Sequence, residues 1–211
     1  MKIAFLDSNL KSLCAAHQIL DNLNCQIHFF SINAEIGLFD ESPGIISKWP
    51  LLPLSWKTSL YSQEPNNNFN AVRRSWFEKS IAISLAKRGT IFHLKTRIIE
   101  ENNDFVKFIG GGIISSGKIH FDKIFRNKHN PEHNTWYGGI TTKGTLKMNN
   151  YIIGRRADST IEVWSKDKLP SHNHWIQQMV WQGKDPKTSI DSEIEIGTQT
   201  ATNFLTKTDA N

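Results

Sequence analysis

A polar segment near the start of the chain contains residue types that bind anions where a helix begins. It lies between the apolar run of residues 1–6 and a stretch, up to about Leu23, whose apolar side chains recur at helical spacing. Its polar members are Asp7, Ser8, Asn9, Lys11 and Ser12. A side-chain oxygen of Ser8 or Asn9 would cap the helix. The free amides and the dipole of the first turn then favour an anion above residues 8–12.

The elements that must position this segment follow one another as in an α/β protein. The predicted elements are a strand at 1–6, a helix at 9–23, a strand at 26–30, a helix at 72–88 and a strand at 90–94. Gly89 follows the second helix as its stop signal. Residues 32–62 are rich in Pro, Gly and Trp, which favours turns and irregular structure. Strand, helix and strand in this order predict parallel pairing.

The second half of the chain is dominated by short β-type runs. They are predicted at Thr96–Glu100, Asp104–Ile109, Gly112–Ser116 and Ile119–Phe125, and then, as an antiparallel meander, at Gly138–Lys147, Asn150–Arg155 and Ser159–Ser165. Residues 174–182 are predicted to be helical, and Glu193–Gly197 to form a last strand leading into residues 198–205. The sequence therefore predicts an α/β fold, with residues 1–211 as one domain and residues 135–165 as a small antiparallel layer.

Composition limits the classes of protein to which the chain can belong. Hydrophobic residues make up 38% of the 211 residues, enough for a substantial core. No run approaches the roughly 20 apolar residues of a membrane helix, and no secretory signal is recognised. Cys14 and Cys25 are expected to be small, reduced core residues. We therefore expect a cytoplasmic protein with no membrane partner.

Charge and aromatic content add little to the choice of partner. The net charge of +5 is spread along the chain without a basic cluster, so nucleic acid is not expected as a partner. The seven tryptophans are scattered and are expected to pack in the core and at its edges.

The order of elements resembles the FAD-dependent oxidoreductases of the aromatic-hydroxylase and lycopene-cyclase type. Residues 3–16 occupy the strand, turn and helix of their FAD fingerprint, and its three glycines fall on Asp7, Asn9 and Ser12. Ser31 matches the position of the ribose-binding acid, and residues 34–37 match the loop that follows. Arg73 or Arg74 matches an arginine near the flavin. Residues 121–125 match a later core strand, and residues 196–201 match the closing Gly-Asp motif. In that last motif Gly197 is kept and Thr198 replaces the aspartate.

The resemblance implies a Rossmann-like FAD/NAD(P)-binding core and FAD as the cofactor. The positions expected to bind it are Asp7, Ser8, Asn9, Lys11, Ser12, Ser31, Arg73, Arg74, Gly197 and Thr198. The missing glycines would serve the tight turn, the approach of the pyrophosphate and the packing of helix on strand. Asp7 adds a like charge beside the pyrophosphate, which Lys11 partly relieves, whereas Asn9 can adopt a positive φ and preserve the turn.

The function implied is a diverged flavin-dependent oxidoreductase, monooxygenase-like and of reduced size, in which FAD binding is weakened or altered. Its substrate would be small and hydrophobic or aromatic, with the Trp-rich loop Lys48–Trp56 helping to wall the pocket. No catalytic residue is identified. The alternative is a cofactor-free protein on the same fold, which binds a protein partner or assembles a complex through exposed tryptophans.

Other patterns carry weaker chemistry. His129 and His133, with His172 and His174 downstream, have no specific metal-ligand spacing, and Pro131 prevents a helical pair, so no metal is expected. Residues 110–112, three glycines, predict a hairpin turn rather than a phosphate loop, because no Lys-Ser/Thr pair and helix follow. A serine hydrolase lacks support because no Gly-x-Ser-x-Gly elbow occurs.

Overall fold

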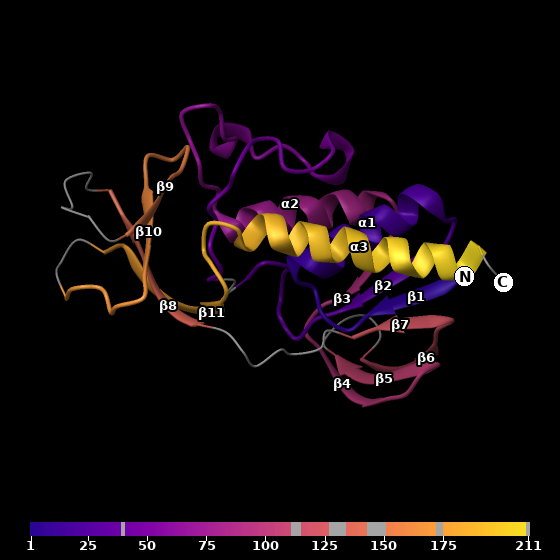
Figure 1. The fold of residues 1–211 in the computed structure, drawn as a ribbon. Helices are drawn as coiled ribbons and strands as arrows, with labels where there is room; N and C mark the ends of the chain where they lie inside the picture. The colour runs from indigo at the N-terminus through magenta and orange to yellow at the C-terminus, as the bar shows by residue number, and fades with distance from the viewer. Residues whose placement is uncertain (39–40, 111–114, 127–133, 143–150, 172–174, 210–211) are drawn as a thin grey trace.

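The computed structural model describes residues 1–38, 41–110, 115–126, 134–142, 151–171 and 175–209. Three helices lie on one face of a parallel sheet, and a small antiparallel sheet lies on its other face (Figure 1). A second antiparallel sheet stands beyond the end where the helices begin (Figure 1). Within the described part of the chain, no helix is both long and apolar enough to cross a bilayer.

The parallel sheet has four strands in the order β3-β2-β1-β7. They are β1 (Lys2–Phe5), β2 (Gln26–Phe30), β3 (Ile91–His93) and β7 (Lys123–Phe125). Ile3 and Phe5 face the core under the helices, whereas Ala4 packs into a second cluster on the opposite face. Apolar residues on both faces suit a strand covered on both sides. The predicted parallel pairing is confirmed.

The helices are α1 (Leu10–Asn22), α2 (Arg74–Lys87) and α3 (Ser189–Asp209). The first two lie within two residues of their predicted bounds, and Gly89 follows α2 with a φ of +89°. The third is a correction, because Glu193–Gly197 was predicted to be a strand. Its inward residues are Ile190, Ile194, Gly197, Ala201 and Phe204, which recur at helical and not at strand spacing.

Threonine side chains also fit the helical form of this segment. The hydroxyls of Thr198, Thr200 and Thr202 donate to the backbone carbonyl four residues earlier at 3.0, 2.7 and 3.0 Å. These bonds satisfy the hydroxyls of the β-branched residues that directly follow the predicted strand, so the threonines are compatible with a helix.

The small sheet on the other face has the order β4-β5-β6, formed by β4 (Thr96–Glu101), β5 (Phe105–Gly110) and β6 (Ser116–His120). The prediction of a single strand from Ile119 to Phe125 is wrong, because β6 ends at His120 and β7 begins at Lys123 in a different sheet. Phe121, between the two strands, is buried with Phe30 and Phe108, so the chain turns around a packed aromatic ring. Residues 111–114, on which part of the hairpin prediction falls, lie outside the described residues.

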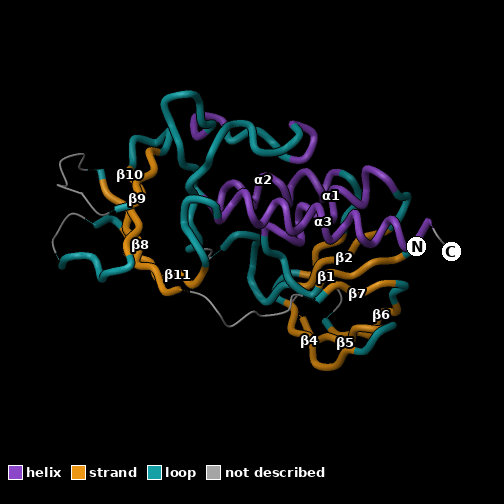
Figure 2. The backbone as a smooth tube through the Cα atoms, in the orientation of Figure 1, coloured by secondary structure: helices purple, strands orange, loops and turns teal. Residues whose placement is uncertain are grey.

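The second antiparallel sheet has the order β11-β8-β10-β9. Its strands are β8 (Asn134–Thr141), β9 (Ile152–Arg155), β10 (Ile161–Ser165) and β11 (Gln177–Gly183). Residues 177–182, predicted to be helical, are instead strand β11, in which Met179 is buried against Trp164 and Trp181 is paired across from Trp136. Cross-strand packing of large rings outweighs the local helical pattern here. Figure 2 shows this sheet apart from the helices and the parallel sheet.

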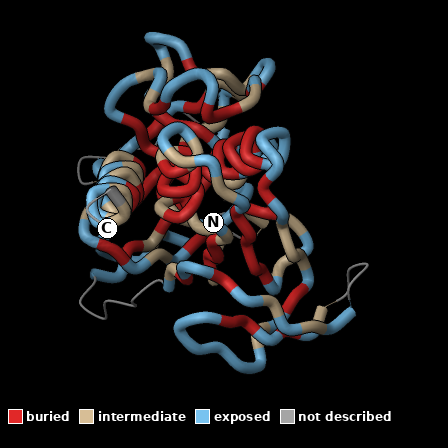
Figure 3. The backbone as a smooth tube through the Cα atoms, turned by 90° about the vertical axis from the view of Figure 1, so that its right-hand side faces the viewer, coloured by how far each residue is buried: buried red, intermediate tan, exposed pale blue. Residues whose placement is uncertain are grey.

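Several of the tryptophans and both cysteines pack as expected, whereas at least one tryptophan is exposed. Trp56, Trp136 and Trp164 are buried, whereas Trp76 is 44% exposed. Cys14 is buried and Cys25 half-buried, and both are free thiols. Burial raises the pKa of each thiol, which keeps it protonated and unreactive. Figure 3 shows the buried residues gathered on the helices and strands at the centre of the molecule.

A buried histidine in α1 makes stability depend on pH. His17 Nε2 lies 3.3 Å from the carbonyl of Ile81, and its Nδ1 faces the guanidinium of Arg88 at 3.0 Å, an arrangement that suits the neutral ring. Burial, followed by the charge of Arg88, lowers the pKa of His17 from 6.5 to about 4. Burial, followed by His93 and Lys2, lowers that of His28 to about 4.

We expect the free energy of unfolding to fall as the pH drops from 7 to 5, because the unfolded chain takes up protons at pH values where the folded chain does not. For His17 alone the expected loss is about 2 kcal/mol over that range. Urea unfolding at both pH values measures it, and His17→Gln should reduce the difference between them. An equal pH dependence in wild type and variant would contradict the assignment to His17.

Candidate functional site

The candidate site lies where the parallel strands end. Asp7 follows β1, Ser31 follows β2 and Arg126 follows β7, so the three residues lie along one edge of the sheet, since parallel strands share their carboxyl end. The N-terminus of α1 is at the same edge, and α2 and α3 also begin at this end of the molecule (Figure 1). This is the place where α/β sheets bind ligands.

The turn before α1 is closed by its own side chains. Asn9 is the N-cap, and its Oδ1 accepts from the Ser12 amide at 3.1 Å. The Ser12 hydroxyl donates to Asp7 Oδ1 at 2.5 Å. The carboxylate of Asp7 therefore lies beside the first turn of the helix, where a bound anion would compete with it.

The expectation that Asn9 preserves the turn through a positive φ is wrong. Asn9 has a φ of −75° and a ψ of 170°, the extended backbone of an N-cap residue. Capping satisfies an amide of the first turn, whereas a left-handed residue here would not place Oδ1 at that amide. The glycine position is thus filled by a side chain that closes the turn.

Two hollows border Asp7. One is an open groove of about 540 Å³ against β4, lined by Leu6, Asp7, Ile98, Ile99, Glu100, Glu101 and Arg126. The other, about 70 Å³, lies between α1, α3 and the end of β7. The groove carries three carboxylates and one guanidinium, and that guanidinium already pairs with Glu101 at 2.9 Å. Its negative lining disfavours a phosphate group.

Arg126, Glu100 and Glu101 were missed by sequence reasoning. No motif marks them, and they come from strands of two different sheets. The available signal was the position of Arg126, directly after a short apolar run that the sequence identified as a core strand.

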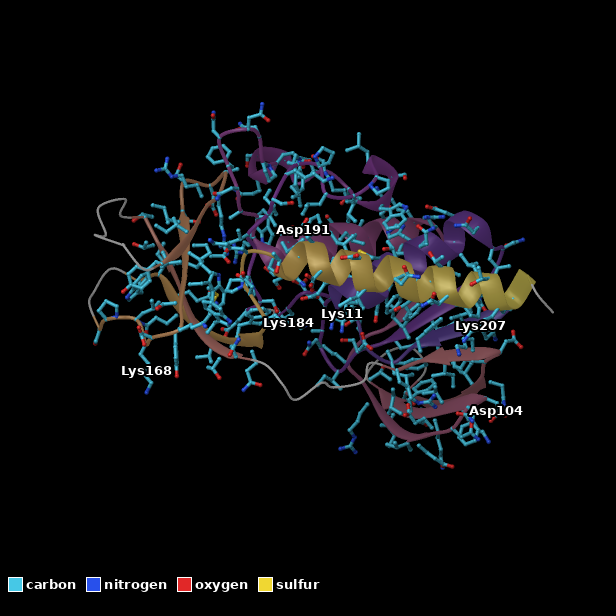
Figure 4. All side chains as sticks on the ribbon, in the orientation of Figure 1. Lys11, Asp104, Lys168, Lys184, Asp191 and Lys207 are labelled. Carbon is cyan, nitrogen blue, oxygen red and sulfur yellow. The ribbon has the colours of Figure 1, made fainter. Side chains whose placement is uncertain are left out.

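Ser8 and Lys11 flank the capped turn and are both half-buried. Lys11 lines the smaller hollow, and Figure 4 shows it beside α3. Asp7 lines the same hollow.

Ser31 lies at the end of β2 and is buried. Its Oγ accepts from the Asn33 amide at 3.2 Å, and its carbonyl accepts from the Thr96 amide at 2.8 Å. The hydroxyl hydrogen can still donate, which is the chemistry of a weak ribose contact.

Arg73 and Arg74 have opposite environments. Arg73 is the exposed residue before α2, and its guanidinium lies 5.2 Å from the ring centre of Trp76. Arg74 is 2% exposed and binds Glu78 Oε1 at 2.8 Å and Glu193 Oε2 at 2.7 Å. Its guanidinium joins α2 to α3 and is committed to these carboxylates.

Gly197 lies within α3, not in a loop after a strand. A Cβ at Gly197 would lie 2.3 Å from the carbonyl oxygen of Lys11, so the glycine allows α3 to approach α1 closely. Thr198 turns its hydroxyl back to the carbonyls of Ile194 and Glu195. The structure therefore gives both residues a role in the helix itself.

The Trp-rich segment Lys48–Trp56 does not wall an open pocket. Trp56 is buried, stacks on His17 at 5.3 Å and donates Nε1 to Asp21 at 2.7 Å. Trp49 packs against Phe77. Both rings belong to the core over the helices, which corrects the expectation of a substrate-facing loop.

Across the ranges that the structure describes, no group of three or more His, Cys, Asp or Glu side chains is arranged to hold a metal ion. The histidines considered for a metal, His129, His133, His172 and His174, lie outside the described residues.

Comparisons with known proteins place this geometry in a structural class. No protein-family model matches the sequence. No curated protein matches it.

Solved structures do match. A flavoprotein/dehydrogenase from Cytophaga hutchinsonii aligns with a TM-score of 0.61 at 9% identity, over 98% of this chain and 79% of that one. Aklavinone-11 hydroxylase, in a ternary complex with FAD and aklavinone, aligns with a TM-score of 0.60 at 7% identity, over 95% of this chain.

The flavin-dependent halogenase CmlS aligns with a TM-score of 0.52 at 14% identity. This chain spans 61% of the hydroxylase and 45% of the halogenase. Identities this low speak for the fold alone. The chain therefore has the α/β FAD/NAD(P)-binding fold found in flavin-dependent oxidoreductases.

Proposed function

We propose that this protein is a diverged flavin-dependent oxidoreductase, monooxygenase-like, in which FAD binding is weakened or altered. The fold supports the flavin part of the proposal, because the similar structures are flavoproteins and one of them holds FAD. Its substrate would be small and hydrophobic or aromatic, in line with the aklavinone held by the hydroxylase.

The contact between Asp7 and Ser12 is the observation that supports weakened FAD binding. FAD held at this turn would place its pyrophosphate over the first turn of α1. The Asp7 carboxylate is already there, and the adjoining groove adds Glu100 and Glu101. Arg74, one of the two arginines expected near the flavin, is held by Glu78 and Glu193.

These residues do not fit a pyrophosphate as a glycine-rich turn holds it. No reaction step is therefore derived through the flavin, and no catalytic residue is assigned. Lys11 and Ser31 remain the proposed contacts for a nucleotide bound in an altered position, and Ser8, Gly197 and Thr198 would border it. Arg73 lines a separate cavity on the other side of α2 and is not counted among these contacts.

The same observation favours a second candidate, a cofactor-free binding or complex-assembly protein on this fold. A turn closed by Asp7, Asn9 and Ser12 is complete without a ligand, since its hydrogen bonds are internal. Exposed Trp76 would serve such a protein as an anchor for a partner.

A titration with FAD, followed by flavin fluorescence anisotropy, tests the proposal. We expect weak binding by the wild-type protein and binding about tenfold tighter by Asp7→Gly, because the change removes a negative charge beside the pyrophosphate. Asp104→Gly is the matched control, since Asp104 lies in the turn between β4 and β5 of the small sheet, away from the turn before α1 (Figure 4).

Three outcomes decide between the candidates. Tighter binding by Asp7→Gly but not by Asp104→Gly supports a weakened FAD site. Affinity that does not change, or falls, in Asp7→Gly removes the pyrophosphate from this turn. If neither the wild type nor the variant with glycines at Asp7, Asn9 and Ser12 binds FAD, the cofactor-free candidate stands.

A further inference from the structure

A cavity on the outer side of α2, away from the turn at Asp7, has the size of a small-molecule site. Its volume is about 640 Å³, within the usual range of roughly 300–1,000 Å³ for ligand pockets. It is bordered by α2, by residues 35, 37, 38, 41, 42 and 58–61 of the segment that crosses above the helices, and by Arg156, Gln177 and Met179 at the second sheet. Figure 2 shows that crossing segment as the long loop above α2.

Large apolar side chains are exposed in this cavity. Trp76 is 44% exposed, Tyr61 85% and Ile83 41%, and all three line the cavity. Exposed apolar groups gathered at one hollow are typical of a ligand site. Tyr61 also has a φ of +52°, a conformation that is rare outside glycine and that recurs where residues clamp ligands.

Cations outnumber carboxylates around the cavity. Arg73, Arg74, Lys79, Lys87 and Arg156 line it, against Glu35 and Glu41. Three of these cations already have carboxylate partners: Arg74 with Glu78 and Glu193, Lys79 with Glu35, and Arg156 with Glu162. Among the described residues, Arg73 and Lys87 have no carboxylate within ion-pairing distance.

Arg73 and Trp76 together form a recognition element. The guanidinium lies over the ring of Trp76, 5.2 Å from its centre. A flat group could pack against the part of the indole that remains exposed while its acid group meets the guanidinium. A guanidinium binds a carboxylate with two parallel hydrogen bonds, which gives direction as well as strength.

We propose that this cavity binds a small planar aromatic compound that carries a carboxylate, with its ring against Trp76 and its acid group at Arg73. The site goes beyond the proposed function, because it stands whether or not FAD binds at the turn of Asp7. Tyr61 is a further exposed aromatic ring in the lining of the same cavity.

Isothermal titration calorimetry of the full chain without FAD tests the proposal, with 2-naphthoate as the probe. The uncharged 2-naphthamide has the same rings without the charge, and octanoate has the charge without the rings. We expect 2-naphthoate to bind one site, and the amide and octanoate to bind at least about tenfold more weakly.

Two variants separate the two contacts. Arg73→Gln should reduce 2-naphthoate affinity about tenfold and leave 2-naphthamide unchanged, whereas Trp76→Ala should weaken both. The controls are Arg97→Gln, at an exposed arginine of β4, and Leu54→Ala, at a 72% exposed side chain outside the cavity lining. All four positions are exposed, so each variant should fold like the wild type.

Several results would overturn the proposal. One is the absence of any heat of binding with 2-naphthoate. Another is equal affinity for the acid and the amide. A third is an equal loss of 2-naphthoate affinity in Arg73→Gln and Arg97→Gln. Displacement of 2-naphthoate by FAD would make the cavity a flavin site and overturn the assignment to an aromatic acid. A failure of FAD to bind anywhere leaves the expected 2-naphthoate result unchanged, so this test and that of the proposed function fail separately.

Discussion

Replacing Arg74 by Gln should lower the free energy of unfolding by about 3–5 kcal/mol, whereas the same change at its neighbour Arg73 should alter it by less than about 0.5 kcal/mol. Arg74 and Glu78 are each 2% exposed, and Arg74 also binds Glu193 on α3. Loss of the guanidinium removes the positive charge that is paired with the buried Glu78 carboxylate, which is the costly case. Chemical denaturation of the two variants beside wild type measures the difference.

A double variant checks the cause. Arg74→Met combined with Glu78→Met removes both charges and keeps apolar volume, so it should be more stable than Arg74→Met alone. Equal stability of the single and double variants would show that Glu78 is not the group left stranded. A large loss in Arg73→Gln would contradict the division of roles between the two neighbours.

This division bears on the candidate site, because the sequence left open which of the two arginines is near a flavin. The structure answers in terms of burial: Arg74 holds α2 against α3, and Arg73 is exposed beside Trp76. Arg73 is thus the one of the pair with a guanidinium able to meet a ligand from solvent.

The sequence predicted the first half of the fold well for a physical reason. In β1 and β2 both faces are apolar, and in α1 apolar residues recur at helical spacing, so local pattern and tertiary packing agree. In α3 they disagree, because a run of Ile, Glu and Thr has strand propensity while Gly197 is needed for close packing on α1. The signal for the helix is the helical spacing of its inward residues from Ile190 to Phe204, which extends beyond the five residues predicted as a strand.

The site was predicted less completely, since its chemistry depends on pairs far apart in the chain. The sequence identified Asp7 and Ser12 as replacements for glycines, but not that the carboxylate and hydroxyl bind each other. It could not pair Arg126 with Glu101, which lie on different sheets, or bring Trp76 and Tyr61 to one cavity. Spacing along the chain carries no information on such contacts.

Glu162 is expected to be the most sensitive residue of the second sheet, and Glu162→Ala should cost about 3–5 kcal/mol. The carboxylate is fully buried in β10. It accepts from Arg156 NH2 at 2.6 Å, from Trp164 Nε1 at 2.6 Å and from the Gly44 amide at 2.7 Å. Its removal leaves a guanidinium, an indole N–H and a backbone amide without their acceptor, and each of these groups is costly to bury unpaired.

Glu162→Gln separates charge from hydrogen bonding. The amide oxygen can still accept from Trp164 and Gly44, but the side chain no longer neutralises Arg156. The free energy of unfolding of Glu162→Gln should therefore lie between those of wild type and Glu162→Ala. Glu195→Ala, at an exposed position of α3, should change the unfolding free energy little. Urea unfolding of the three variants gives the order, and a loss in Glu162→Ala no larger than in Glu195→Ala would contradict it. Because Gly44 belongs to the segment that leads from β2 to α2, this one carboxylate fastens the second sheet to the α/β core and fixes Arg156 at the wall of the α2 cavity.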